Sequence, residues 1–196
     1  IFMSSKFKIL GKKIIIHNGF FKMKEITLKF QKYDGKWSNE IKRELFGGAQ
    51  VSAVLPYDPD NKKIVLIQQF RPGTISKKSN NYLDEIVAGI IDKDETPEET
   101  AIRECFEETG CKAKNLRPIQ GYFPAPGSSE SFYHLFLGEV VAPNKEIIKG
   151  LENENEDILV KSFSFEEVKK KMENNEILNG LTLIALQWFF LNIYKS

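Results

Sequence analysis

Apolar and polar residues alternate along positions 13–46, and a segment at 33–36 that contains Asp34 and Gly35 interrupts the alternation. A period of two is typical of strands that bury one face, and turn residues between two such runs favour a reversal of the chain. Positions 1–46 are therefore expected to form a small antiparallel β-sheet that precedes the main fold.

Longer apolar runs after this segment predict the strands of a hydrophobic core. The runs cover positions 49–57, 63–70, 82–89, 119–123, 132–141 and 157–163. An Asp-Pro-Asp-Asn turn at 58–61 joins the first two runs.

Capping residues predict where the first helix begins and ends. Thr96 is a good N-cap, Pro97 suits the first helical position, and Glu99 completes a capping box with Thr96. Gly110 tolerates the left-handed conformation that ends many helices. A helix is therefore expected between Thr96 and Gly110.

Two more helices are predicted in the C-terminal part. Ser164 followed by a glutamate three residues later is a capping box, and it opens a helix that runs to about Glu173. The last helix opens at Gly180 or Thr182 and contains the apolar run 181–194, which polar residues interrupt and which is too short to span a bilayer.

The order of these elements favours one fold class. Strands and helices are mixed without a regular βαβ repeat, which predicts an α+β fold or a layered α/β/α sandwich with a mixed sheet. The 196 residues suit one domain with a small appendage. We therefore expect an N-terminal β-sheet and dimerisation segment at 1–46 and a main domain at 47–196.

Charge and cysteine content narrow the functional class. The chain carries 28 basic and 27 acidic residues, a balance that argues against a dedicated nucleic-acid-binding or membrane-surface protein. Cys105 and Cys111 are the only cysteines, and no secretory signal pattern opens the sequence. A reducing, cytoplasmic setting is expected, with both cysteines acting as small core hydrophobes.

The first predicted helix carries an unusual cluster of charge. Glu104, Glu107 and Glu108 are spaced i, i+3 and i+4, so their carboxylates share one face, whereas Ile102 and Phe106 are expected to pack on the sheet from the other face. Like charges at this spacing repel each other, and a bound metal ion would relieve the repulsion. The alternative is a solvated acidic face without function.

The residues around this cluster argue against that alternative. The sequence reads Gly89, five residues, Glu95, seven residues, and then Arg103-Glu104-Cys105-Phe106-Glu107-Glu108-Thr109-Gly110. This pattern closely resembles the signature of the Nudix hydrolases, and average residue usage would produce it by chance on the order of once per million such chains. The resemblance implies an α/β/α sandwich and a metal-assisted hydrolysis of a diphosphate.

The same resemblance implies roles for the residues of the signature. Arg103 would orient the glutamates and Glu95 would support the loop. Magnesium, for which manganese can substitute, would be held by oxygen ligands. The metal ligands implied are Ala88 through its backbone carbonyl, Glu104, Glu107, which has a catalytic role as a bridging or second ligand, Glu108 and Glu156.

Further segments resemble the ADP-ribose pyrophosphatase branch of the family, whose products are AMP and ribose 5-phosphate. The substrate-binding residues implied are Phe20, Arg43, Arg71, Glu85, Pro126, Gly127 and Glu130. Three of these residues have a simpler interpretation. Phe20 could be a core residue, Glu85 a solvent-facing strand residue, and Pro126 only a turn former.

The acidic segment 152–157 would normally be interpreted as a solvated loop. It resembles the loop that, in the family, brings a glutamate over the site to activate water. The resemblance places this role on Glu154 and a metal contact on Glu156, but the two neighbouring glutamates leave either as the base.

Other functions stay open at this stage. Another nucleoside diphosphate sugar, such as a GDP- or UDP-sugar, could be hydrolysed by the same chemistry. A non-catalytic module that senses ADP-ribose is a further alternative, because fold does not fix function. The expected partner is a small-molecule nucleotide sugar, without nucleic acid or membrane, in a homodimer that exchanges its N-terminal segments.

Overall fold

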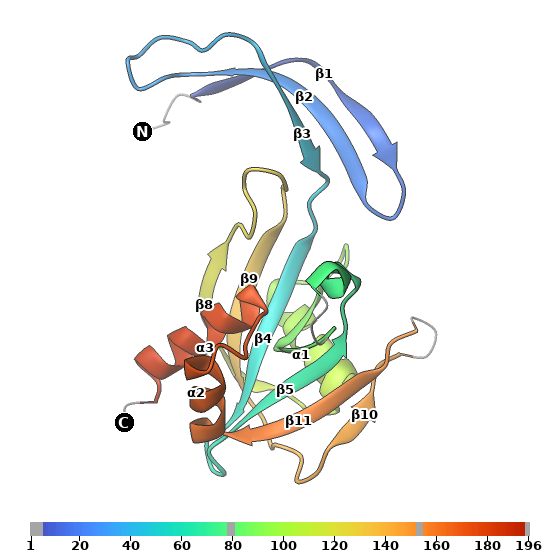
Figure 1. Cartoon of the computed structure of the whole chain (residues 1–196), viewed down its shortest axis with the longest axis vertical. Coiled ribbons are helices and arrows are strands. Elements are labelled where there is room, and N and C mark those ends of the chain that lie inside the picture. Colours follow the sequence, from blue (N-terminus) through green and yellow to red (C-terminus); the bar gives the residue numbers. More distant parts are fainter. Residues whose placement is uncertain (1–5, 78–80, 152–154, 195–196) are drawn as a thin grey trace. The chain divides into compact units, whose positions relative to one another are not determined.

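The structure is a computed structural model that describes residues 6–77, 81–151 and 155–194 (Figure 1). The chain divides into two compact units. The first unit consists of Ile1–Ala49 together with Phe123–Phe132, and the second unit consists of Gln50–Tyr122 together with Tyr133–Ser196. The first unit thus includes a segment from the middle of the chain, which the sequence assigned to the main domain.

The first unit is built on a three-stranded antiparallel sheet in the order β1-β2-β3. Its strands are β1 (Phe7–Asn18), β2 (Lys22–Phe30) and β3 (Ile41–Phe46). The predicted turn at 33–36 lies between β2 and β3, where an isolated bridge joins Gln31 to Trp37. The expected small antiparallel sheet is confirmed.

This sheet leaves much apolar surface uncovered. Ile26 is the only hydrophobic residue of the first unit that is buried in the part of the chain the structure describes. The large apolar side chains that remain exposed on β1 and on the turn after it are Phe7, Ile9, Ile14, Ile15, Ile16, Phe20 and Phe21. A patch of this kind is a common mark of a protein interface.

The second unit contains an eight-stranded sheet in the order β10-β11-β5-β4-β9-β8, with β6 paired to β5 and β7 paired to β4. The strands are β4 (Gln50–Asp58), β5 (Lys63–Phe70), β6 (Tyr82–Glu85), β7 (Val87–Ile90), β8 (Lys114–Tyr122), β9 (Phe132–Glu139), β10 (Ile147–Lys149) and β11 (Ile158–Ser164). The predicted runs all contribute strands, whereas β10 and the short 3₁₀ helix η1 (Pro72–Lys77) were not predicted.

Both faces of this sheet are covered by helices, which makes it an α/β/α sandwich. Successive residues of a strand point to opposite faces. On β5, Ile64 and Leu66 belong to one buried cluster and Val65 and Ile67 to the other. The first cluster contains residues of α2 (Phe165–Glu173) and α3 (Gly180–Asn192), and the second contains residues of α1 (Pro97–Thr109). The predicted α+β fold is confirmed.

The helix boundaries follow the capping residues. Thr96 and Ser164 form the predicted capping boxes, and Gly110 ends α1 with φ of 72°. Asn179 caps α3, which begins at Gly180. No helix in the described ranges is both long and apolar enough to cross a membrane.

One orientation was predicted wrongly. Ile102 and Phe106 do not pack on the sheet, since 37% and 60% of their surfaces are exposed. The side of α1 that packs on the sheet carries Ala101, Cys105 and Glu108, all of which are buried. Ala101 and Cys105 are small, so they let the helix lie close to the sheet, and the larger side chains face away.

The predicted strand at 82–89 is divided in two. The segment pairs with β5 as far as Glu85 and with β4 from Val87 onward, so the chain changes its hydrogen-bonding partner at Ile86. Glu85 therefore lies before this break and Ala88 after it.

Candidate active site

Helix α1 is fixed to the sheet at its beginning. The hydroxyl of Ser52, a buried residue of β4, donates a hydrogen bond to the carbonyl of Pro97 at 2.5 Å. In the capping box, the Glu99 N–H donates to the Thr96 hydroxyl at 3.2 Å and the Thr96 N–H donates to the Glu99 carboxylate at 2.8 Å. The position of the helix is therefore set independently of the acidic residues further along it.

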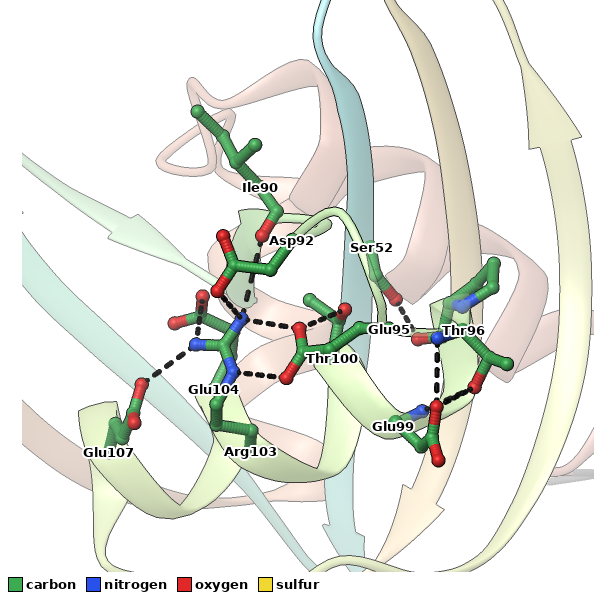
Figure 2. Close-up of polar contacts among 11 residues, drawn as sticks. Ser52, Ile90, Asp92, Glu95, Thr96, Glu99, Thr100, Arg103, Glu104 and Glu107 are labelled. Atoms are coloured by element: carbon green, nitrogen blue, oxygen red, sulfur yellow. Dashed lines mark hydrogen bonds and ion pairs between the residues drawn. The ribbon is translucent and has the colours of Figure 1, made fainter.

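Arg103 joins Glu95, which precedes α1, to Glu104 and Glu107 within the helix, as Figure 2 shows. Its Nε donates to Oε1 of Glu95 at 2.7 Å and its Nη2 to Oε2 at 2.9 Å, which is a bidentate pair. Its Nη1 donates to Glu104 at 2.8 Å and to Glu107 at 2.9 Å. One guanidinium thus holds three of the predicted carboxylates in place.

These bonds stabilise the ionised form of Glu95. Hydrogen bonds from Arg103, and then from the Thr100 hydroxyl, lower the pKa of Glu95 to about 2. The same pairing with Glu95 raises the pKa of Arg103. Both groups remain charged at neutral pH, so the negative charge of Glu95 is balanced by Arg103.

Glu108 is in the opposite situation. Only 4% of its surface is exposed, and its Oε2 has no hydrogen-bond partner. Burial, followed by the charges of Glu104 and Glu156, raises its pKa well above the ordinary 4.5, against a smaller opposing effect of the Ala88 N–H bond and the charge of Arg71. A buried carboxylate with an unpaired oxygen is costly unless a cation completes it.

Glu104 lies close to the backbone of β7. A Cβ at Gly89 would come within 1.8 Å of its Oε1, so the present position of this carboxylate requires a glycine there. Burial raises the pKa of Glu104 despite its hydrogen bond to Arg103. The first glycine of the signature is thus explained by the close approach of a side chain.

These carboxylates fit a divalent cation by their chemistry, because hard cations bind oxygen ligands and the unpaired Oε2 of Glu108 needs one. The side chains are not yet in a binding arrangement. In the described part of the chain, no three His, Cys, Asp or Glu side chains converge in a way that could hold a metal ion. Arg103 engages an oxygen of both Glu104 and Glu107.

A second charged pair lies at the break between β6 and β7. Glu85 is 3% exposed, so its interpretation as a solvent-facing strand residue is wrong. Its Oε2 accepts hydrogen bonds from Nε and Nη2 of Arg71, at 2.9 and 2.6 Å. Its Oε1 accepts a hydrogen bond from Nδ2 of Asn179 at 2.8 Å. The charge of Arg71 also reaches Glu108, whose pKa it lowers slightly against the larger effect of burial.

Glu156, from the acidic segment, lies near the same cluster. Glu156 is half-buried, and its Oε2 accepts the Leu151 N–H at 3.2 Å. Its charge contributes to the raised pKa of Glu104 and of Glu108. Glu154 lies outside the described residues.

The other predicted substrate-binding residues belong to the first unit. Phe20 is in the turn between β1 and β2 with 90% of its surface exposed, so it is not a core residue of this chain. Arg43 is an exposed residue within β3 and donates to the Lys42 carbonyl at 2.8 Å. The predicted proline loop, with Pro126 and Gly127, belongs to the same unit.

The proline loop pairs with the end of β3. The Phe46 N–H donates to the Ser128 carbonyl at 2.8 Å, and Phe46 accepts the Glu130 N–H at 3.3 Å. Glu130 also forms an ion pair with Lys24 of β2. These contacts explain why the segment from the middle of the chain belongs to the first unit.

Sequence reasoning missed Asn179 and Ser52. An Asn before Gly180 is a recognisable helix cap, so the signal for the cap was present, but its contact with Glu85 spans 94 positions and has no sequence signature. Ser52 gave no signal, because nothing in an apolar strand run marks the residue that will face a helix terminus.

Comparison with known proteins identifies relatives along nearly the whole chain. A family model described as NUDIX domain matches residues 48–181. The ADP-ribose pyrophosphatase of Haemophilus influenzae is 36% identical over 97% of this chain and 89% of that protein. The ADP-ribose pyrophosphatase of Bacillus subtilis is 33% identical over 92% and 94%, respectively. The GDP-mannose pyrophosphatase of Shigella flexneri is 29% identical over 95% and 96%.

Proposed function

This chain belongs to the Nudix family, and we propose that it hydrolyses the diphosphate of ADP-ribose to AMP and ribose 5-phosphate with the help of bound divalent metal. The observation that carries the proposal is Glu108, a buried carboxylate with an unpaired oxygen inside the family signature. The relatives named ADP-ribose pyrophosphatase support the choice of substrate.

Magnesium is the proposed metal, and manganese can replace it. The proposed ligands are Glu104, Glu107, Glu108, Glu156 and the backbone carbonyl of Ala88. When bound, the metal would lower the pKa of the attacking water and would place positive charge beside the diphosphate. Arg103 holds Glu104 and Glu107 beside each other through the contacts of 2.8 and 2.9 Å.

Water activation is assigned to the acidic loop. Glu154 is the proposed general base, and Glu156 is the alternative base as well as a metal contact. The influence of Glu156 on the pKa of Glu104 and Glu108 supports a role for this residue at the cluster. A base in this loop would take the proton from the attacking water.

Substrate binding is assigned to the residues that the sequence comparison with the family predicted. Arg71 would donate to the diphosphate, because its Nη1 forms no hydrogen bond to any residue that the structure describes. Phe20 would stack on the adenine, for which its exposure supplies the necessary free surface. The remaining proposed contacts with the substrate are Arg43, Glu85, Pro126, Gly127 and Glu130.

We further propose a homodimer that exchanges residues before Phe46. The support is the exposed apolar surface of β1, which has little core of its own to pack against. Sedimentation at micromolar concentration would show a species of twice the chain mass. A monomer under these conditions would rule out the exchange.

One alternative substrate class has a specific observation in its favour. The GDP-mannose pyrophosphatase relative covers 95% of the chain, so a GDP- or UDP-sugar is the second candidate. A non-catalytic ADP-ribose-sensing module is disfavoured because every carboxylate of the signature is present.

A substrate panel tests the proposal directly. ADP-ribose, GDP-mannose and a UDP-sugar are incubated separately with magnesium, and release of AMP, GMP or UMP is measured. We expect the highest kcat/KM for ADP-ribose. A preference for GDP-mannose or the UDP-sugar would move the substrate assignment, and absence of hydrolysis in all three would favour the sensing module.

A further inference from the structure

The beginning of α3 contacts a charged residue of the candidate site. Asn179 is the N-cap of α3, and its Oδ1 accepts the backbone N–H of Thr182 at 2.9 Å. The amide nitrogen of the same side chain donates to Oε1 of Glu85 at 2.8 Å. One side chain therefore both caps a helix and binds a buried carboxylate.

Thr182 extends this contact to the strand break. Its side chain is fully buried, and its hydroxyl donates to Oδ1 of Asn179 at 3.1 Å and accepts the backbone N–H of Ile86 at 2.9 Å. Ile86 has no partner in either strand register, because the chain changes from β5 to β4 at this residue. The start of α3 thus supplies the hydrogen bond that neither neighbouring strand provides.

The hydrogen bonds to Glu85 fix the direction of Arg71. One carboxylate oxygen accepts two N–H groups of Arg71, and the other accepts Asn179. Glu85 is 3% exposed, so little water is available to replace a lost donor. The carboxylate cannot rotate without leaving one oxygen unsatisfied, which is costly in a buried position.

Arg71 in turn is held with one edge of its guanidinium on Glu85. Its side chain is 43% exposed, whereas that of Glu85 is 4% exposed, so the pair presents the arginine to solvent and keeps the carboxylate inside. A planar guanidinium anchored by one edge is suited to bind a phosphate oxygen with its remaining N–H groups.

We propose that Asn179 is a positioning residue for substrate binding, which orients Arg71 through Glu85, with Thr182 as its support. The ligand in this inference, a nucleoside diphosphate, rests on the proposed function. Asn179 itself touches no substrate. An arginine that is oriented in advance loses less freedom on binding, so loss of Asn179 should weaken binding of the diphosphate.

Two substitutions separate the positioning role from the cap. Asn179→Asp and Asn179→Ser retain a good N-cap, but the aspartate lacks the amide donor and the serine is too short to take its place at Glu85. The matched control is Ser164→Ala, which removes the cap of α2, where the hydroxyl of Ser164 bonds to Glu167 and not to Arg71 or Glu85. We expect about a tenfold higher KM with kcat within about threefold in both Asn179 variants, and an unchanged KM in the control.

A double-mutant cycle shows whether Asn179 acts through Arg71. If it does, Asn179→Ser should raise KM much less in an Arg71→Lys background than in the wild type, because the oriented guanidinium is already gone. Fully additive effects would mean that Asn179 does not act through Arg71, and would overturn the inference.

A spectroscopic measurement tests the contact without turnover. The chain has four arginines, so the Nε–H resonance of Arg71 can be assigned by comparison with Arg71→Lys. We expect this resonance to shift and to exchange faster with solvent in both Asn179 variants and to stay unchanged in Ser164→Ala. An unchanged resonance in both Asn179 variants overturns the inference, and so does an unchanged KM on any substrate that the wild type hydrolyses.

This design separates the two proposals. Failure of the wild type to hydrolyse ADP-ribose would refute the proposed substrate before any variant is examined. The Arg71 resonance would still decide whether Asn179 orients this residue.

Discussion

The carboxylates near the two ends of α1 have opposite electrostatic environments. Near its beginning, Glu95 receives a bidentate pair from Arg103, and its pKa falls to about 2. Near its end, Glu108 is buried with an unpaired oxygen, and its pKa is raised well above the ordinary value. The first end is complete within the chain, whereas the second lacks a positive charge.

This difference distinguishes a structural carboxylate, just before α1, from a functional one near the end of the helix. A fold gains nothing from a buried charge without a partner, because desolvation is not repaid. Such a group is retained when a ligand supplies what is missing. We therefore propose that Arg103 and Glu95 hold the cluster and that Glu108 binds the cation.

The largest effect on activity is expected at Glu108, whose carboxylate has an unpaired oxygen. Glu108→Gln should lower kcat by about 10³-fold or more in saturating magnesium, because loss of several kcal/mol of charge stabilisation has this size. Glu98→Gln is the matched control, since Glu98 lies on the same helix with an exposed side chain. Near wild-type turnover of Glu108→Gln, measured as AMP release, would remove Glu108 from the metal site.

The second-largest effect on activity is expected in the acidic segment 152–157. Glu154→Gln should lower kcat by roughly 10²- to 10⁴-fold and leave KM almost unchanged, since a general base acts mainly in the transition state. Steady-state kinetics of Glu154→Gln and Glu156→Gln are compared. Full activity of the first with loss in the second would move the base to Glu156, and full activity of both would leave the water to be activated within α1.

Substitution of Arg103, whose charge is already paired within the chain, should lower activity less. Arg103→Lys keeps the charge but loses the bidentate geometry, so we expect kcat/KM to fall about 10- to 100-fold, the range typical of residues that orient metal ligands. Arg117→Lys is the control, because Arg117 lies over the ring of Trp188 instead of on a carboxylate. An equal loss in both variants would show that arginine content, and not the orientation of the glutamates, matters.

The smallest expected effect concerns pH and stability without metal. The pKa of Glu95 is lowered, so its contribution is present above about pH 4.5 and is lost as the pH falls toward 2. The pKa of Glu108 is raised, so the folded state holds this proton more tightly and loses stability as the pH rises above 4.5.

Urea unfolding of the metal-free protein measures both contributions. The stability advantage of the wild type over Glu95→Gln should shrink as the solution becomes acidic, whereas the stability advantage of Glu108→Gln over the wild type should grow as the pH rises. The same sign of pH dependence for both variants would contradict the difference between the two ends of α1.

Much of this site could be predicted from sequence because its signals are local. The capping box at Thr96, the C-terminal Gly110 and the spacing of the three glutamates each depend on neighbours within a few positions. The fold class followed from the order of apolar runs. The caps and the glutamate spacing are decided within one element, and the fold class is decided by the order of elements along the chain.

The errors and omissions arise where distant segments meet. The glutamates were placed on the helix face opposite the sheet and Phe106 on the face that packs on it, but Glu108 is buried and Phe106 is 60% exposed. Helical spacing shows which residues share a face and not which face meets the sheet. The contact between Asn179 and Glu85 joins elements 94 positions apart, for which a single sequence carries no signal.

Thermal unfolding with and without magnesium tests the central claim most directly. If Glu108 awaits a cation, magnesium at about 100 times its Kd should stabilise the wild type by about 2.7 kcal/mol, which raises Tm by several degrees. Glu108→Gln should have a higher Tm than the wild type without metal and should lose most of the magnesium-dependent increase. A metal-free variant that is no more stable than the wild type, together with an equal rise of Tm in magnesium for both proteins, would contradict a cation-binding role of Glu108.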